Sequence, residues 1–144
     1  MLLPHSALVL VVDGSRMQIL RNRGQKAAIE LEIVSEDKLK NPASHVMEAD
    51  SPGRSHDSKG QGSHAYEADD LHQRREDEFV ADALTQLRAA VGNDDKIVLI
   101  APPKALGHLR KLLNKDMEAR VVAEINKDLG HLKPAEIAAA LQER

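Results

Sequence analysis

The pattern of apolar and polar residues predicts a β-hairpin at the start of the chain. Ala7–Val12 is an almost continuous apolar run, which is typical of a strand that is covered on both faces. Asp13-Gly14 follows directly and indicates a tight turn, because glycine accepts a positive φ at little cost. Met17–Arg21 is then the returning strand of the hairpin.

A third strand is predicted over Ala27–Val34, where apolar residues recur at every second position. Ile29, Leu31 and Ile33 alternate with glutamates, so we expect one face of this strand to be buried and the other to be in water. The first third of the chain therefore has the pattern of a three-stranded antiparallel meander.

The regular pattern lapses in a long polar loop over about residues 36–72. Prolines, glycines, serines and charged residues dominate this segment. A loop of this length inside a compact domain is usually functional or disordered. A short helix around Leu39–Met47 is an alternative for part of it.

Helical spacing returns after the polar loop. The apolar residues that share one helical face are Phe79, Val80, Ala83, Leu84, Leu87 and Val91. Gly92 is a good C-terminal stop for this helix. Ile97–Ala101 then predicts a central strand buried on both faces, and a proline pair starts a helix that runs to about Leu113. A last strand within residues 119–125 and a helix from Pro134 complete the chain.

The order of these elements predicts a single α/β domain over residues 1–144. The alternation of strands and helices in the second half implies parallel pairing through right-handed crossovers. We therefore expect one mixed five-stranded sheet, an antiparallel meander joined to parallel strands, with helices on its faces. That is the layout of a ribonuclease-H-like sheet.

Composition narrows the classes of function. The net charge of -3 argues against a non-specific nucleic-acid binder, and one Tyr and one Phe are too few for base stacking along a single strand. The absence of cysteine excludes a disulfide scaffold and a thiolate metal site. No apolar run approaches the roughly 18 residues of a membrane span, and the first run lacks the features of a signal peptide. We expect a cytoplasmic protein with no membrane partner and no cofactor.

Four sequence strings in this order resemble the host-attachment protein family of bacteria. They are VVDGSRMQIL near the start, PGRSHDS in the polar loop, LIAPPKALGHLRKLL after it and INKDLGHLKPAEIAAAL at the end. The resemblance covers almost the whole chain. The family's name refers to attachment of bacteria to host cells, and for a chain without an export signal the resemblance implies an indirect role in attachment.

That family is in turn similar to the middle domain of archaeal and eukaryotic peptide-chain release factors. The similarity rests on the strand order and on a Gly-Gln loop before the long helix. In release factors a Gly-Gly-Gln tip enters the peptidyl-transferase centre and helps water attack the peptidyl-tRNA ester. The matching string here is Gly60-Gln61-Gly62, with Lys59 where the first glycine would stand. The resemblance makes Gln61 the candidate catalytic residue, and the displaced glycine argues against ester hydrolysis.

The polar loop also contains the best candidate for anion binding. Arg54 with Ser55 can hold a phosphate through its forked N–H donors and the hydroxyl. The alternative is an ordinary surface turn. His56 and His64 flank the Gly-Gln-Gly string and are further candidates for binding, as are Gly60, Gln61 and Gly62 themselves.

A second group of candidate binding residues lies on the helix after the central strand. Lys104, Arg110 and Lys111 place cations on or beside that helix, where they can contact RNA phosphates or an acidic partner. The alternative is a helix face in water.

Other acidic and histidine residues support weaker hypotheses. The histidines of the loop match no compact metal-binding motif, so no metal is expected. Nuclease activity would require Asp13, after the first strand, to converge with acids such as Asp95 and Asp128. The acidic run Glu76–Glu78 near the expected helix start suits the helix dipole and needs no function.

Three functions stay open. The favoured one is a non-catalytic binding module that contacts the ribosome or a structured RNA. The second is a peptidyl-tRNA ester hydrolase that uses the Gly-Gln-Gly loop, and the third is a protein-binding regulator of surface attachment. A homodimer is a further alternative, because Ala27–Val34 has the pattern of a sheet edge and exposed edges can pair between subunits.

Overall fold

Five strands form one open, mixed sheet in the computed structural model, which describes residues 1–39 and 61–144, the latter with side chains from residue 70. The strands are β1 (Leu8–Val12), β2 (Arg16–Asn22), β3 (Leu31–Lys38), β4 (Ile97–Ala101) and β5 (Val121–Asn126). Their order is β3-β2-β1-β4-β5, with β3, β2 and β1 antiparallel and β1, β4 and β5 parallel. The predicted α/β fold is confirmed.

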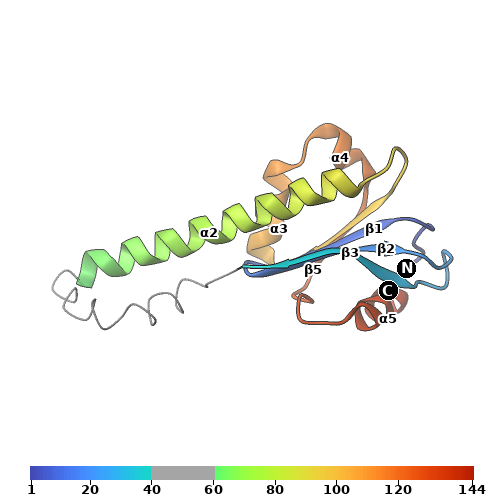
Figure 1. Ribbon diagram of the computed structural model, residues 1–144, viewed down its shortest axis with the longest axis horizontal. Helices are drawn as coiled ribbons and strands as arrows, with labels where there is room; N and C mark the ends of the chain where they lie inside the picture. The colour runs from blue at the N-terminus through green and yellow to red at the C-terminus, as the bar shows by residue number, and fades with distance from the viewer. Residues whose placement is uncertain (40–60) are drawn as a thin grey trace.

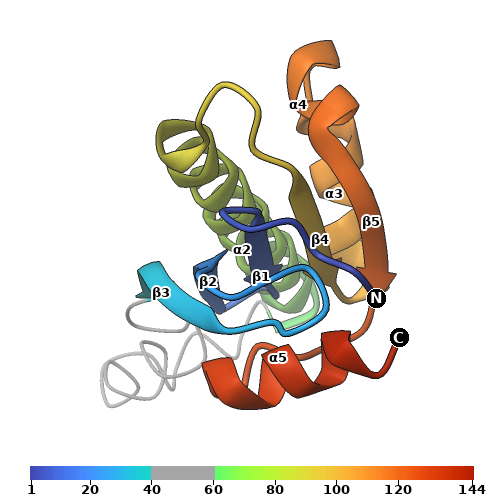
Figure 2. The same cartoon turned by 90° about the vertical axis from the view of Figure 1, so that its right-hand side faces the viewer.

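Helices cover both faces of this sheet (Figures 1 and 2). In the described residues they are α2 (Gln61–Ala90), α3 (Pro103–Leu112), α4 (Lys115–Arg120) and α5 (Pro134–Gln142). α2 and α3 pack on one face, and α5 packs on the other. The amine of Met1 donates to the carbonyl oxygen of Leu141 in α5 at 3.2 Å, so the two ends of the chain are adjacent.

The central strands contribute to two apolar cores at once. In β1, Leu8, Leu10 and Val12 face α2 and α3, whereas Val9 and Val11 face α5. Every residue of β1 and of β4 is buried. This double burial is why both strands have continuous apolar sequences instead of an alternating pattern.

The edge strand β3 differs from its prediction in bounds and in burial. It begins four residues later than the predicted Ala27–Val34 and continues to Lys38. Ile33, predicted to be buried, is 38% exposed. Leu31, at the start of the strand, packs against the core on the α5 side, and Ile33 lies beyond that contact. The position of β3 at the sheet edge is as predicted.

The predicted polar loop over residues 36–72 is wrong at both ends. β3 continues to Lys38, and α2 begins at Gln61. The first part of α2 extends beyond the sheet (Figure 1). Because it does not pack on the sheet, its sequence lacks the apolar residues at helical spacing from which a helix is predicted. The predicted helix around Leu39–Met47 falls almost wholly outside the described residues.

The short helix α4 is absent from the sequence prediction. Asn114 caps it, because its side-chain oxygen accepts a hydrogen bond from the backbone N–H of Met117 at 2.8 Å. Met117 is buried against the core beneath α2 and α3. Among the described residues, no helix combines the length and the apolar character needed to cross a membrane.

Candidate functional site

Helix α2 has two halves with different surroundings. It contains 30 residues, so it is about 45 Å long. Among residues 70–90, whose side chains the structure describes, the buried ones are Phe79, Val80, Ala83, Leu84 and Leu87, which all belong to the core under the helix. We call residues 79–90 the packed half and residues 61–78 the projecting half. The projecting half extends beyond the edge of the sheet at which β1 and β4 end (Figure 1).

The candidate catalytic residue that the sequence predicts lies at the far end of the projecting half. Gln61 is the first residue of α2, with Gly62 and His64 in the same first turn. The prediction that these three residues lie in a loop is wrong. From Phe79, the first buried residue among those with described side chains, the helix continues outward for about 27 Å to Gln61. Gln61 therefore lies at the end of a long helical arm.

A small cavity of about 130 Å³ lies where this arm leaves the sheet. Its lining residues are Gly14, Gln73, Glu76, Asp77, Val80, Pro102, Lys104 and Ala105. Within it, the side-chain amide of Gln73 donates to a carboxylate oxygen of Asp77 at 2.8 Å, one helical turn further on. The base of the arm thus has a small, mostly apolar cavity between α2, α3 and the β1–β2 turn.

The β1–β2 turn is shaped by Asp13 and by the close approach of α2. One carboxylate oxygen of Asp13 accepts hydrogen bonds from the backbone N–H groups of Ser15 at 2.7 Å and of Arg16 at 2.9 Å. Gly14 does not have the positive φ that the sequence predicted. Instead, a Cβ atom at Gly14 would collide with the carboxylate of Glu76. Glycine at this position leaves room for the Glu76 side chain against the turn.

The comparison with protein families agrees with this architecture. The model of the bacterial archaeo-eukaryotic release factor family 12 matches residues 6–141, which include the whole sheet and both halves of α2. The chain belongs to this release factor family. The predicted resemblance to release factors is therefore confirmed. A comparison with curated proteins found no match.

In this member of the family, the candidate binding residues are distributed over several places. Arg54, Ser55, His56 and Gly60 lie outside the described residues. The structure describes only the backbone of Gln61, Gly62 and His64, at the start of α2. Their roles stay predictions, and the structure contributes the position of the last three at the end of the arm.

The three candidate cations of α3 do not form one patch. Lys104 lies in the first turn of α3 and lines the cavity at the base of the arm. Arg110 lies near the other end of α3, where its Nε donates to the Glu124 carboxylate of β5 at 2.6 Å. Lys111 is exposed in the last turn. Of the three, Lys104 alone is near the projecting half.

For two residues of the cavity, the sequence predicts a role that differs from the position found in the structure. Glu76 and Asp77 were expected to stabilise the dipole at a helix start, but they lie fifteen residues or more beyond Gln61 and the first turn contains no acidic residue. Both residues instead belong to the lining of the cavity, as Lys104 does. No local motif marks Gln73 in the sequence. Only the fold of the chain brings Gln73 next to α3.

The other end of α2 is fixed by a partly buried ion pair. The guanidinium of Arg21 in β2 donates to the Asp95 carboxylate at 3.0 Å and to the backbone carbonyl of Ala90 at 2.9 Å. The backbone N–H of Gly92 donates to the same carboxylate at 2.7 Å. Burial alone would raise the pKa of Asp95, but these hydrogen bonds and the charges of Arg21 and Arg120 lower its pKa below the ordinary 3.8.

Asp95 does not join Asp13, as the nuclease hypothesis would require, whereas Asp128 follows β5 at the same end of the sheet as Asp13. Asp13 follows β1 and Asp95 precedes β4, and these strands are parallel neighbours. The two carboxylates therefore lie at opposite ends of the sheet, a strand length of about 17 Å apart. In the part of the chain that the structure describes, no three His, Asp or Glu side chains are grouped to hold a metal ion.

Proposed function

We propose that this release-factor-family chain is a cytoplasmic binding module that contacts the ribosome with the projecting half of α2. One observation carries the proposal. Residues 70–78 of this half contribute no fully buried side chain, and the helix nevertheless continues outward as far as Gln61. A polar helix gains little from burial, so its extension beyond the core serves contact with something else.

The charge of the chain favours contact with a narrow binding site over contact with a broad polyanionic surface. The described residues Asp70–Glu78 include Arg74 and Arg75 but also several acids, and the whole chain has a net charge of -3. Attraction to RNA is therefore local, through few phosphate contacts near the arm. We expect weak dependence of binding on salt compared with a basic RNA-binding domain.

Co-sedimentation with purified ribosomes tests the proposal, with two matched charge reversals on the same helix. Arg74 is exposed on the projecting half and Arg88 is exposed on the packed half. Arg74→Glu and Arg88→Glu change the net charge equally. We expect the first to weaken binding about ten-fold, because a phosphate contact is replaced by repulsion, and the second to leave it within about two-fold. Equal binding by all three proteins would refute contact through the arm.

A second candidate function is hydrolysis of the peptidyl-tRNA ester. The observation that favours it is the position of Gln61 as the first residue of the arm, in a chain of a release factor family. In such a reaction the glutamine amide orients a water molecule, which attacks the ester carbonyl. The products are the free peptide acid and the tRNA with its terminal hydroxyl restored.

Release of a labelled peptide from stalled ribosomes separates the two functions. If the chain is a hydrolase, Gln61→Ala abolishes peptide release without lowering the amount of protein that co-sediments with ribosomes. If it is a binding module alone, neither protein releases peptide above the rate without protein. The expected role in host attachment, direct or through a regulatory partner, stays a prediction to be tested in cells.

A further inference from the structure

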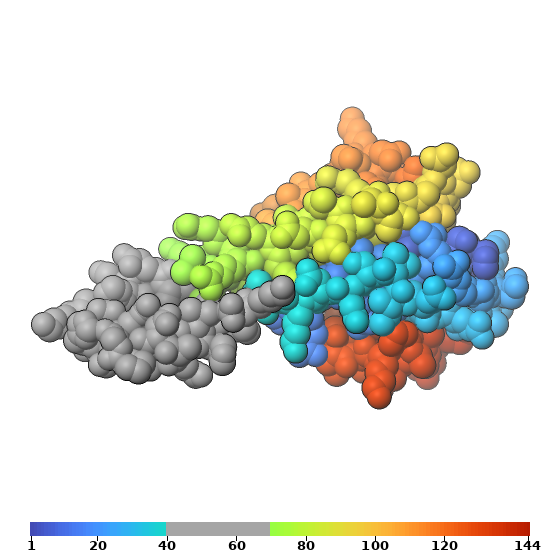
Figure 3. Space-filling model, viewed as in Figure 1, coloured from blue at the N-terminus to red at the C-terminus, as the bar shows by residue number. Residues whose placement is uncertain are grey.

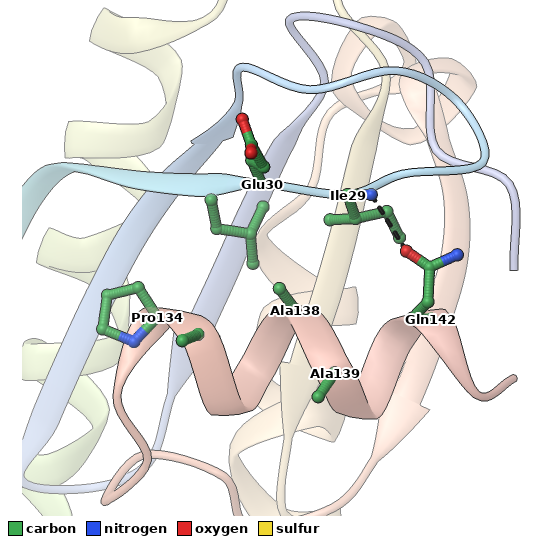
Figure 4. Close-up of a pocket in the computed structure, with 8 residues that line it drawn as sticks. Ile29, Glu30, Pro134, Ala138, Ala139 and Gln142 are labelled. Carbon is green, nitrogen blue, oxygen red and sulfur yellow. Dashed lines mark hydrogen bonds between the residues drawn. The ribbon is translucent and has the colours of Figure 1, made fainter.

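An apolar groove lies between α5 and the segment that leads into β3 (Figure 4). Its volume is about 550 Å³. Its lining residues are Ile29, Glu30, Leu31, Pro134, Ala135, Ala138, Ala139 and Gln142. The helix side of the groove consists mostly of alanines, which allow another chain to approach the backbone of α5 closely.

The groove is held open by hydrogen bonds that fix the segment before β3. The side-chain oxygen of Gln142 accepts from the backbone N–H of Ile29 at 2.9 Å (Figure 4), and its amide donates to the carbonyl of Ala27 at 2.6 Å. On the other side, the buried Asn22 accepts from the backbone N–H of Glu30 at 3.1 Å and donates to Leu3 at 2.9 Å. The groove is therefore preformed, which lowers the entropy cost of binding.

Among the described residues, no strand pairs with the outer edge of β3, the strand beside the groove. β3 is the last strand of the sheet, and Figure 3 shows it at the surface between α2 and α5. The carbonyl of Glu30 accepts from the N–H of Arg23 on the β2 side at 2.8 Å. Because backbone groups alternate in direction along an antiparallel strand, Leu31 and Ile33 direct theirs away from β2. These groups are available to pair with an added strand.

The side chains along this edge combine apolar and acidic character. Ile33 is 38% exposed and Val34 is 42% exposed, and Val34 is the extra residue of a bulge opposite β2. The acidic residues of the segment are Glu30, Glu32, Glu36 and Asp37, against Lys38 as the one basic residue within residues 30–38. Glu32 is partly neutralised by Arg23 at 3.3 Å. The edge as a whole favours a basic partner with apolar side chains.

We propose that this edge and groove bind an extended, basic peptide segment as an additional strand. Its backbone pairs with Leu31 and Ile33, its alternate apolar side chains enter the groove beside Ala139, and its lysines or arginines face the acids of β3. The bulge at Val34 limits the pairing to the first part of the strand. This site is independent of the projecting half of α2 and of the proposed ribosome contact.

The same charges disfavour a second copy of this chain as the occupant. If two copies of β3 paired antiparallel with Ile33 opposite Ile33, Glu30 would lie opposite Glu36 of the other copy. If Ile33 lay opposite Leu31, the two Glu32 residues would face each other. Like charges directly opposite on paired strands are destabilising. The alternative of a homodimer through this edge is therefore the weaker one.

The probe for the experiment is a fluorescent peptide of about nine residues that alternates lysine and valine. Binding to the full chain is followed by fluorescence anisotropy, and the site is mapped by amide chemical shifts in NMR. We expect shifts confined to residues 29–37 and 134–142. A peptide that alternates glutamate and valine serves as the control, and equal binding of both peptides would overturn the proposal, as would shifts elsewhere or no binding at about 1 mM.

Two pairs of variants localise the contact. Ala139→Leu fills the groove from an exposed position of α5 and is expected to weaken peptide binding about ten-fold, whereas Ala89→Leu, the same change at an exposed position of α2, leaves it unchanged. Glu30→Lys is expected to weaken binding of the lysine peptide, and Asp82→Lys, with the same change in net charge, is not. If Glu30→Lys and Asp82→Lys behave alike, or if Ala139→Leu binds normally while its free spectrum remains that of the folded chain, the proposal is wrong.

Discussion

The two halves of helix α2 differ in what holds them in place. The packed half places five buried residues on the sheet, and its end is fixed to β2 by the contact of Arg21 with Ala90. The projecting half has local stabilisation, such as the bond from Gln73 to Asp77, and a contact with the β1–β2 turn at its base. One continuous helix thus serves as a core element at one end and as an arm at the other. The difference indicates that stability and function can be altered separately along α2.

The largest difference is expected between two leucines of this helix. Leu84 is 1% exposed in the packed half, and Leu71 is 42% exposed in the projecting half. Leu84→Ala is expected to lower the free energy of unfolding by about 3 kcal/mol, because it leaves a cavity in the core, and Leu71→Ala by less than about 0.5 kcal/mol. Urea denaturation followed by circular dichroism measures both. Similar losses for both variants would mean that the projecting half is packed as well.

A smaller and pH-dependent effect is expected where the packed half ends. Asp95→Asn weakens the ion pair with Arg21 and is expected to cost about 1 kcal/mol at neutral pH. Since the pKa of Asp95 is lowered in the folded chain, its stabilisation is present above the ordinary value of 3.8 and is lost as the pH falls below that value. The difference between wild type and variant should therefore disappear in acid. A difference that stays constant down to pH 2 or so would contradict the role of this charge.

The smallest effect is expected at the base of the arm. Gly14→Ala brings a Cβ against the carboxylate of Glu76, whose flexible side chain can move, so we expect a cost of about 0.5–1 kcal/mol. Glu76→Ala removes the obstacle, and the double variant should be close to Glu76→Ala alone. A double-mutant cycle from urea denaturation gives the coupling. Additive costs would show that the arm does not approach this turn closely.

The sequence predicts the packed parts of the chain better than the parts at its margins. β4 has the predicted bounds, because a strand that is covered on both faces needs a continuous apolar run. Ile33 has the right spacing for burial, but its exposure depends on how far α5 reaches along the edge, which no local pattern encodes. The first part of α2 is not predicted for the same reason. A helix without a core beneath it does not need apolar residues at helical spacing.

The candidate site likewise has one part that the sequence predicts and one part that it does not. The resemblance to release factors identifies the Gly-Gln string, which no pattern of apolar residues marks, and the role of this string stays a prediction. The cavity residues Gln73 and Glu76 had no distinguishing sequence signal, because they are brought to the turn at Gly14 by the angle at which α2 crosses the sheet. Contacts between distant segments of this kind require the tertiary structure.

Site-specific crosslinking to ribosomes tests the central claim most directly. A photoreactive benzoylphenylalanine replaces Arg74 in the projecting half or Arg88 in the packed half, and each protein is irradiated with ribosomes under the same conditions. We predict crosslinks to ribosomal RNA or protein from position 74 and none above background from position 88. Equal crosslinking from both positions, or crosslinking from position 88 alone, would contradict the assignment of the projecting half as the ribosome-contacting arm.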